Sequence, residues 1–136
     1  MALSAAAAHN ALIAFNRFGF GARPGGPALI GNDPKAALIA EVNTPNIARI
    51  NDSSLPTYAQ ACNDAVSDSD LTSANYEKEL NARVDKQMSV DVGFVERLVV
   101  FWANHFSMNV NKIDIVWGTI GQWERDVIRP NVLGKF

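Results

Sequence analysis

The chain has 136 residues, enough for one domain of ordinary size. Charged residues make up 19% of it and the formal net charge is −2, so it lacks the basic surface that nucleic acids and anionic membranes require. The single cysteine, Cys62, excludes an internal disulfide and any zinc site built from several thiolates.

The beginning of the chain does not have the features of an export signal. Residues 1–4 carry no basic side chain, and the apolar stretch after them is interrupted by His9 and Asn10. No run in the sequence reaches the ~20 apolar residues that span a bilayer. The sequence therefore predicts no membrane span, and we expect a cytoplasmic protein by default.

The first predicted helix covers residues 5–18. Ser4 can cap it, because a serine oxygen accepts a hydrogen bond from the free amides of a first helical turn, and its four consecutive alanines favour helix. Gly19 and Gly21 are expected to end it, since glycine readily adopts the left-handed conformation of helix ends. The glycine- and proline-rich residues 22–32 predict a loop.

The next two predicted helices are short. Asp33 followed by Pro34 indicates the start of a helix that runs to about Val42. Residues 43–56 are polar and rich in turn formers, and a third helix is expected over residues 57–66.

A longer helix is predicted over residues 72–88, after an acidic linker at residues 67–70. Its apolar side chains recur at helical spacing and its charged side chains lie away from them, which is typical of a helix that packs one stripe against a core. The stripe consists of Tyr76, Leu80, Val84 and Met88.

The most aromatic helix is predicted over residues 92–108, with Asp91 as its cap. Its wide apolar stripe consists of Val95, Leu98, Phe101, Trp102, His105 and Phe106. A sixth helix is expected to hold Ile115, Trp117, Ile120, Trp123 and Val127, and Pro130 should end or kink it. The sequence therefore predicts an all-α fold of about five or six helices, joined by Gly/Pro-rich and polar loops.

The last residues, 132–136, are mostly apolar, whereas a natural terminus is usually polar and exposed. We therefore expect residues 1–136 to be a single N-terminal helical segment of a larger helical domain, truncated after Phe136.

His105 is the first candidate for chemistry. It shares a helix face with Leu98 and Phe101, so its imidazole is expected to point inward, where it could serve as an acid, a base or a metal ligand. The other histidine, His9, is distant in the sequence and no metal-binding histidine spacing exists, so a core histidine bonded to a neighbour is the alternative. Asn104 beside it could take part in a site or could cross-link helices.

Three arginines are candidates for binding a ligand or an anion: Arg97, Arg125 and Arg129. Arg125 and Arg129 are four residues apart, and like charges at this spacing repel each other unless an acidic group lies between them. That group is either an internal carboxylate, Glu96 or Glu124, or an anionic ligand held by the guanidinium groups. The sequence predicts no metal site and no cofactor.

Three segments of the chain resemble the motifs of one bacterial family. Residues 14–25 read AFNRFGFGARPG, residues 96–106 read ERLVVFWANHF and residues 123–136 read WERDVIRPNVLGKF. In this order they are similar to the opening motif, the aromatic helix and the following block of the family catalogued as domain of unknown function 1800. The resemblance covers nearly the whole chain.

The resemblance implies an architecture and candidate positions rather than an activity. Full-length members are longer and helical, so this chain would supply their first part. Asn131 stands where the family frequently has a histidine, and Trp123 where it commonly has a tyrosine. A site that used that histidine would be altered here.

We therefore expect a binding or structural module within a larger bacterial protein. Its partner would be the remainder of the same protein beyond Phe136, or another protein. The alternative is part of an enzyme whose active site is completed by residues beyond Phe136. That alternative predicts that four side chains converge around a concave space, as a general base or an anion clamp: His105, Asn104, Arg125 and Arg129.

Overall fold

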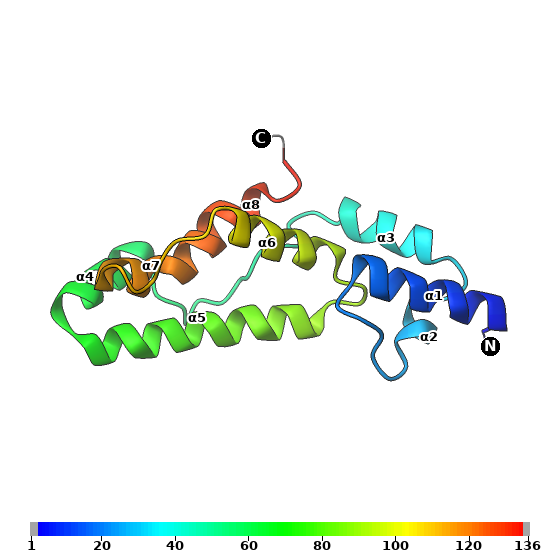
Figure 1. Cartoon of the computed structure of the whole chain (residues 1–136), viewed down its shortest axis with the longest axis horizontal. Coiled ribbons are helices and arrows are strands. Elements are labelled where there is room, and N and C mark those ends of the chain that lie inside the picture. The colour runs from blue at the N-terminus through cyan, green and yellow to red at the C-terminus, as the bar shows by residue number, and fades with distance from the viewer. Residues whose placement is uncertain (1–2, 135–136) are drawn as a thin grey trace.

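The computed structural model describes residues 3–134, and every regular element within them is a helix, which confirms the all-α prediction (Figure 1). One end of the molecule holds α1 (Ala5–Phe18), α2 (Gly26–Ile30) and α3 (Pro34–Asn43), and the other holds α4 (Tyr58–Ser67), α5 (Ser69–Ser89) and α7 (Asp114–Trp123). Helix α6 (Phe94–His105) lies between the two ends. Helix α7 continues through a π-helical turn, η1 (Glu124–Ile128), into α8 (Arg129–Asn131).

Two of the predicted helix starts are confirmed by their caps. Ser4 accepts a hydrogen bond from the amide of Ala7 at 3.2 Å, and Asp33 accepts one from the amide of Ala36 at 3.0 Å. These side-chain oxygens satisfy amides that have no partner within the helix. The short helix α2, within residues expected to form a loop, was not predicted.

Two other predictions of helix boundaries were wrong. The expected acidic linker belongs partly to α5, because the Asp68 carboxylate accepts hydrogen bonds from the first amides of that helix. Asp91 does not cap α6. Glu41 of α3 caps this helix instead. Its carboxylate accepts hydrogen bonds from the amides of Gly93 at 3.2 Å and Val95 at 2.9 Å. A cap that comes from another helix leaves no local signal in the sequence.

The apolar core is divided into two clusters. The first lies where α1 and α2 meet the segment before α6 and contains Ala11, Ala14, Phe15, Ile30 and Val92. The second joins α6 to η1 and the residues after it, and contains Ala48, Val95, Val99, Ile128 and Val132. Helix α6 therefore holds the two ends of the molecule together.

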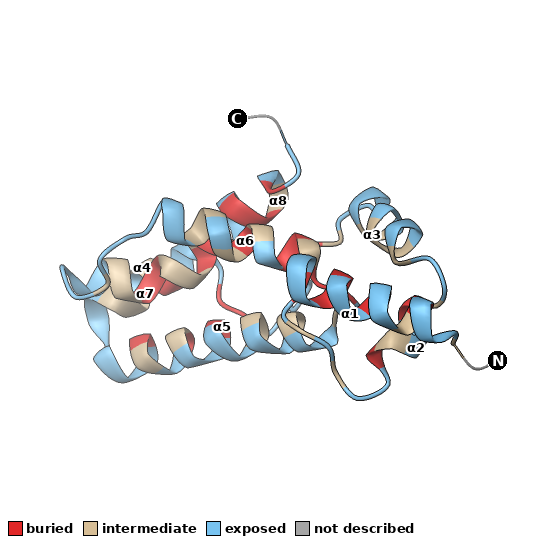
Figure 2. Ribbon diagram, turned by 45° about the vertical axis from the view of Figure 1, so that its right-hand side comes forward, coloured by how far each residue is buried: buried red, intermediate tan, exposed pale blue. Residues whose placement is uncertain are grey.

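Three of the four side chains in the predicted apolar stripe of α5 are exposed, contrary to the sequence prediction: Leu80, Val84 and Met88. Tyr76 is half-buried and packs against Trp117, whereas Thr72, Asn75 and Glu79 are buried. Figure 2 shows that α5 is exposed along most of its length, with its buried positions on the side toward α7. The polar stripe is buried because α5 packs against the glycines of α7, which let the two helices approach closely at these positions. At Gly121 an added Cβ would lie 2.4 Å from the Cβ of Glu79, and at Gly118 it would lie 3.2 Å from Cγ2 of Thr72.

No helix among the described residues combines the length and the apolar character needed to cross a bilayer.

Gln122 on α7 leads to a testable prediction, because its side chain is buried and neither amide atom has a hydrogen-bond partner among the described residues. A buried polar group without a partner costs free energy that an apolar side chain of similar size avoids. We expect Gln122→Met to raise the free energy of unfolding by about 1 kcal/mol, measured by urea denaturation. The same change at half-buried Gln87 on α5 is the control and should have little effect. A loss of stability in Gln122→Met would show that the amide is satisfied.

Candidate functional site

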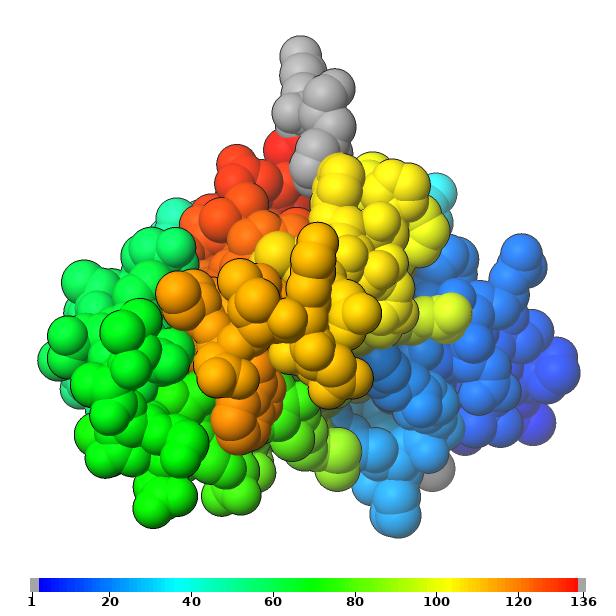
Figure 3. All heavy atoms as spheres, turned by 60° about the vertical axis from the view of Figure 1, so that its left-hand side comes forward, coloured from blue at the N-terminus to red at the C-terminus, as the bar shows by residue number. Residues whose placement is uncertain are grey.

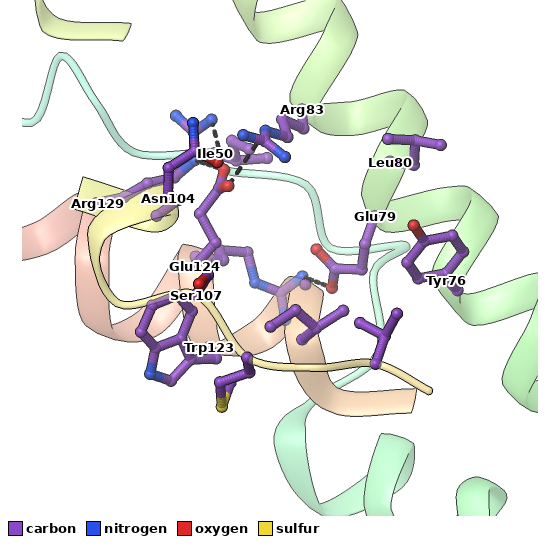
Figure 4. A pocket seen from close by; sticks show the side chains of 16 residues that line it. Ile50, Tyr76, Glu79, Leu80, Arg83, Asn104, Ser107, Trp123, Glu124 and Arg129 are labelled. Atoms are coloured by element: carbon purple, nitrogen blue, oxygen red, sulfur yellow. Dashed lines mark hydrogen bonds and ion pairs between the residues drawn. The ribbon is translucent and has the colours of Figure 1, made fainter. Parts of the chain in front are cut away.

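A cavity of 220 Å³ opens between α5, the end of α6 and the α7–η1 helix. One wall is formed by the segment after α6, which lies across α7 in Figure 3. Figure 4 shows charged side chains of α5, η1 and α8 meeting in this cavity. The lining residues are Ile50, Tyr76, Glu79, Leu80, Arg83, Ala103, Asn104, Ser107, Met108, Val110, Ile120, Gly121, Trp123, Glu124, Arg125 and Arg129.

The Arg129 guanidinium is the centre of the charged network and is fully buried. Its Nη1 and Nη2 donate to the two carboxylate oxygens of Glu96 at 2.8 and 3.1 Å. Its Nε donates to Glu124 at 3.1 Å, and Nη1 also donates to the Ala48 carbonyl at 2.9 Å. A bidentate Arg–carboxylate pair is the most directional ion pair available to proteins. Arg129 therefore fixes α6, η1 and the segment before α4 relative to one another.

The π-helical turn explains why Glu124 and Arg129 can pair although they are five residues apart. In η1 the Arg129 amide donates to the Glu124 carbonyl, so the turn closes over five residues instead of four. Pro130 follows at once; proline lacks an amide hydrogen, and its ring crowds the carbonyl four residues before it. The wider turn lets the helix continue past Pro130 and places the two charged side chains over one another.

Arg83 of α5 extends the network to the opposite wall of the cavity. Its Nε lies 3.1 Å from Oε2 of Glu124, so the Glu124 carboxylate lies between Arg83 and Arg129 (Figure 4). The Arg83 side chain is 32% exposed, compared with 0% for Arg129. Its terminal nitrogens make no hydrogen bond to any of residues 3–134, so this guanidinium keeps free donors.

A second ion pair joins Arg125 of η1 to Glu79 of α5 at 2.6 Å. Arg125 also donates to the carbonyl of Pro56 at 2.6 Å, in the segment before α4. Burial raises the pKa of Glu79 to about 7, although the Arg125 charge acts in the opposite direction. The nearby carboxylates of Asp126, Glu124 and Asp52 also raise it. This side chain is 5% exposed and can change its charge near neutral pH.

The raised pKa of Glu79 predicts a pH-dependent stability. The folded state holds the Glu79 proton more tightly than the unfolded chain, in which the pKa is near 4.5. Its contribution to stability is therefore complete below pH 4.5 and is lost as the pH rises through about 7. We expect the free energy of unfolding to fall by roughly 2–3 kcal/mol over this range, measured by urea denaturation at several pH values.

The matched variants are Glu79→Gln, which should lose this pH dependence, and Glu77→Gln on the exposed face of α5, which should keep it. An unchanged pH profile in Glu79→Gln would mean that another group is responsible.

The structure brings together three of the five residues singled out from the sequence. Asn104, Arg125 and Arg129 line the cavity. The prediction that an acidic group separates the two arginines is confirmed for Arg129, which pairs with both Glu96 and Glu124. Arg125 pairs with Glu79 of α5 at 2.6 Å and with the neighbouring Asp126 at 3.5 Å.

His105 does not line the cavity, and the expectation that it points inward was wrong. It is exposed and stacks among aromatic rings, with its ring 4.9 Å from that of Phe106 and 6.1 Å from that of Phe101. The buried face of α6 is formed by Val95, Glu96 and Val99, and His105 lies on the other side of the helix.

Arg97 also lies outside the cavity. Its Nη1 donates to the carbonyls of Arg17 at 2.9 Å and Gly19 at 3.1 Å, at the end of α1. A guanidinium at a helix C-terminus satisfies carbonyls that lack partners in the helix. The geometry gives Arg97 a structural role.

Sequence reasoning missed Glu79 and Arg83. Both belong to a polar stripe at helical spacing on α5, which also contains Thr72 and Asn75. This spacing is visible in the sequence, but a polar stripe on a helix usually faces solvent, so it did not indicate a buried site.

Among residues 3–134, no group of three or more histidine, cysteine, aspartate or glutamate side chains is arranged to hold a metal ion. The site offers guanidinium, carboxylate, amide and hydroxyl groups beside apolar walls, a set suited to binding small polar groups.

The comparisons with known proteins give one match. A family model described as "Protein of unknown function (DUF1800)" matches residues 13–136. No curated protein and no solved structure matches the chain.

Proposed function

This chain belongs to the DUF1800 family, and we propose that it is a helical binding module whose cavity between α5, α6 and η1 holds a group of a ligand. The observation that carries this proposal is the convergence of Arg83, Glu124 and Arg129 beside an apolar wall over a 220 Å³ cavity. Sites for small molecules are usually concave and apolar, with a few fixed polar groups. We place the module within a larger helical protein.

The pairing within the network favours binding over chemistry. Both oxygens of Glu124 are held by arginines, and Arg129 is enclosed by its partners. Groups fixed in this way keep their positions before a ligand arrives, which lowers the entropy lost on binding. Around them, the side chains of Asn104 and Ser107 line the cavity without a hydrogen bond to any described residue. These two side chains are available to a ligand.

Catalysis within a larger protein is the second candidate function, and Glu79 is the observation that favours it. A carboxyl with a pKa of about 7 in a cavity is suited to general acid–base chemistry near neutral pH. In that case Glu79 acts as the general acid or base, the role that the sequence analysis considered for His105. Turnover of an ester, amide, glycoside or phosphoester substrate by the purified chain, lost in Glu79→Gln, would replace the binding proposal with this one.

The binding proposal is tested by proton–nitrogen correlation spectra of the chain with a panel of small fragments of four kinds: anionic, cationic, neutral polar and apolar. We expect at least one kind to shift resonances of residues 79–83, 103–108 and 120–125 together. Ser107→Phe should abolish these shifts by filling the cavity, and Ser53→Phe, at an exposed serine in the segment before α4, is the matched control. The proposal fails if no fragment perturbs these three segments.

A further inference from the structure

We infer that the group held in this cavity is a carboxylate attached to a small apolar body. The inference rests on the proposed binding function and adds the chemical class of the ligand. It follows from which charged groups in the cavity still have free hydrogen-bonding capacity and from the apolar part of the lining.

Arg83 is the charged side chain with donors left for a ligand. Arg129 uses all three guanidinium nitrogens on Glu96, Glu124 and Ala48. Arg125 uses both terminal nitrogens, on Glu79 and Pro56. Arg83 uses only Nε in its ion pair, is one-third exposed and lines the cavity with its terminal nitrogens unpaired among the described residues. Two parallel N–H donors of a guanidinium match the two oxygens of a carboxylate.

The remaining lining requires an apolar body of limited size. Leu80 and Met108 are exposed at the cavity, and Trp123 and Ile120 contribute apolar surface beside them. Covering such side chains is favourable in proportion to the apolar area removed from water. The 220 Å³ volume lies below the roughly 300–1,000 Å³ of sites for drug-sized ligands. A single ring or short branched chain carrying one carboxylate fits this description.

The test compares 3-phenylpropionate with its neutral amide by isothermal titration calorimetry at pH 7, supported by the tryptophan fluorescence of the chain. We expect the acid to bind at least roughly tenfold more tightly than the amide, because a charge-assisted hydrogen bond is lost in the amide. Arg83→Gln should remove this preference, so that the acid and the amide bind with similar affinity. Arg49→Gln, at an exposed arginine outside the cavity, is the matched control and should preserve the preference.

Arg83→Lys distinguishes loss of the guanidinium group from a folding defect. It keeps a positive charge beside Glu124 but removes the two parallel donors of the guanidinium. It should fold normally and lose most of the preference for the acid. Equal affinity of the wild-type chain for acid and amide would overturn the inference and leave the proposed binding function intact. If cationic or neutral fragments bind in the cavity and the acid does not, the inference is also overturned and the proposed binding function is kept. Absence of binding by every class would overturn both.

Discussion

Replacing Arg129 with methionine is expected to lower the free energy of unfolding by about 3–5 kcal/mol, because it leaves the Glu96 carboxylate buried without its partner. Glu96 is 1% exposed and receives two hydrogen bonds from Arg129. The effect on Glu124 is smaller, because Arg83 still pairs with its other carboxylate oxygen. Urea denaturation followed by circular dichroism measures the change.

The double variant Glu96→Met with Arg129→Met separates the loss of an attraction from the burial of an unpaired charge. Removing both charged groups and replacing them with apolar side chains of similar volume is often close to neutral. We therefore expect the double variant to recover most of the stability that the single variant loses. A double variant as unstable as Arg129→Met would mean that the network itself, rather than the orphaned carboxylate, sets the stability.

Replacing Gly19 with alanine is expected to destabilise the fold by more than about 3 kcal/mol through a steric clash. An added Cβ would lie 2.0 Å from the carbonyl oxygen of Val92, which is backbone and cannot rotate away. Gly19 also offers its carbonyl to Arg97, so a shift there disturbs the end of α1 and its contact with α6. Thermal and urea unfolding of the purified variant measure the loss.

Gly25→Ala is the control for this prediction, because it separates the clash from backbone strain. Gly25 has a left-handed conformation, with φ 78° and ψ −11°, and open space around its Cβ position, so alanine there should cost only about 1 kcal/mol. Gly19 has a φ of −107°, which alanine adopts freely. Equal losses in the two variants would contradict the steric explanation.

The sequence predicted the helices well where local chemistry decides them. Ser4 and Asp33 cap the helices expected of them, and Pro130 marks the place where the last helix changes its geometry. Gly19 was expected to end α1 in a left-handed conformation. It ends the helix in an extended one, and the left-handed glycine is Gly21.

The directions in which the helices face could not be predicted in the same way. Helix α5 carries both an apolar and a polar stripe, and the choice between them was made by the glycine face of α7, at Gly118 and Gly121. Helix α6 is apolar on several sides, so the inward face of Val95 and Val99 could not be distinguished from the outward face of His105. Each choice depends on contacts between residues far apart in the sequence.

Only part of the candidate site could be predicted, because the rest depends on contacts between residues far apart in the sequence. Arg125 and Arg129 were recognisable as like charges that need acidic partners, and Glu96 and Glu124 were named as such partners. Glu79 comes from α5 and reaches Arg125 across 46 positions of the sequence. Its buried position follows from the packing of α5 against α7 and is not visible in the residues around it.

The most direct test of the binding proposal is a crystal structure of the chain soaked with the fragment that shifts the cavity resonances most strongly. The proposal predicts electron density for the fragment between α5 and the end of α6, beside Arg83, with the pairs of Arg129 and Arg125 unchanged. Density for the fragment only at other surfaces, or a cavity closed by contact between Leu80 and Met108, would contradict it.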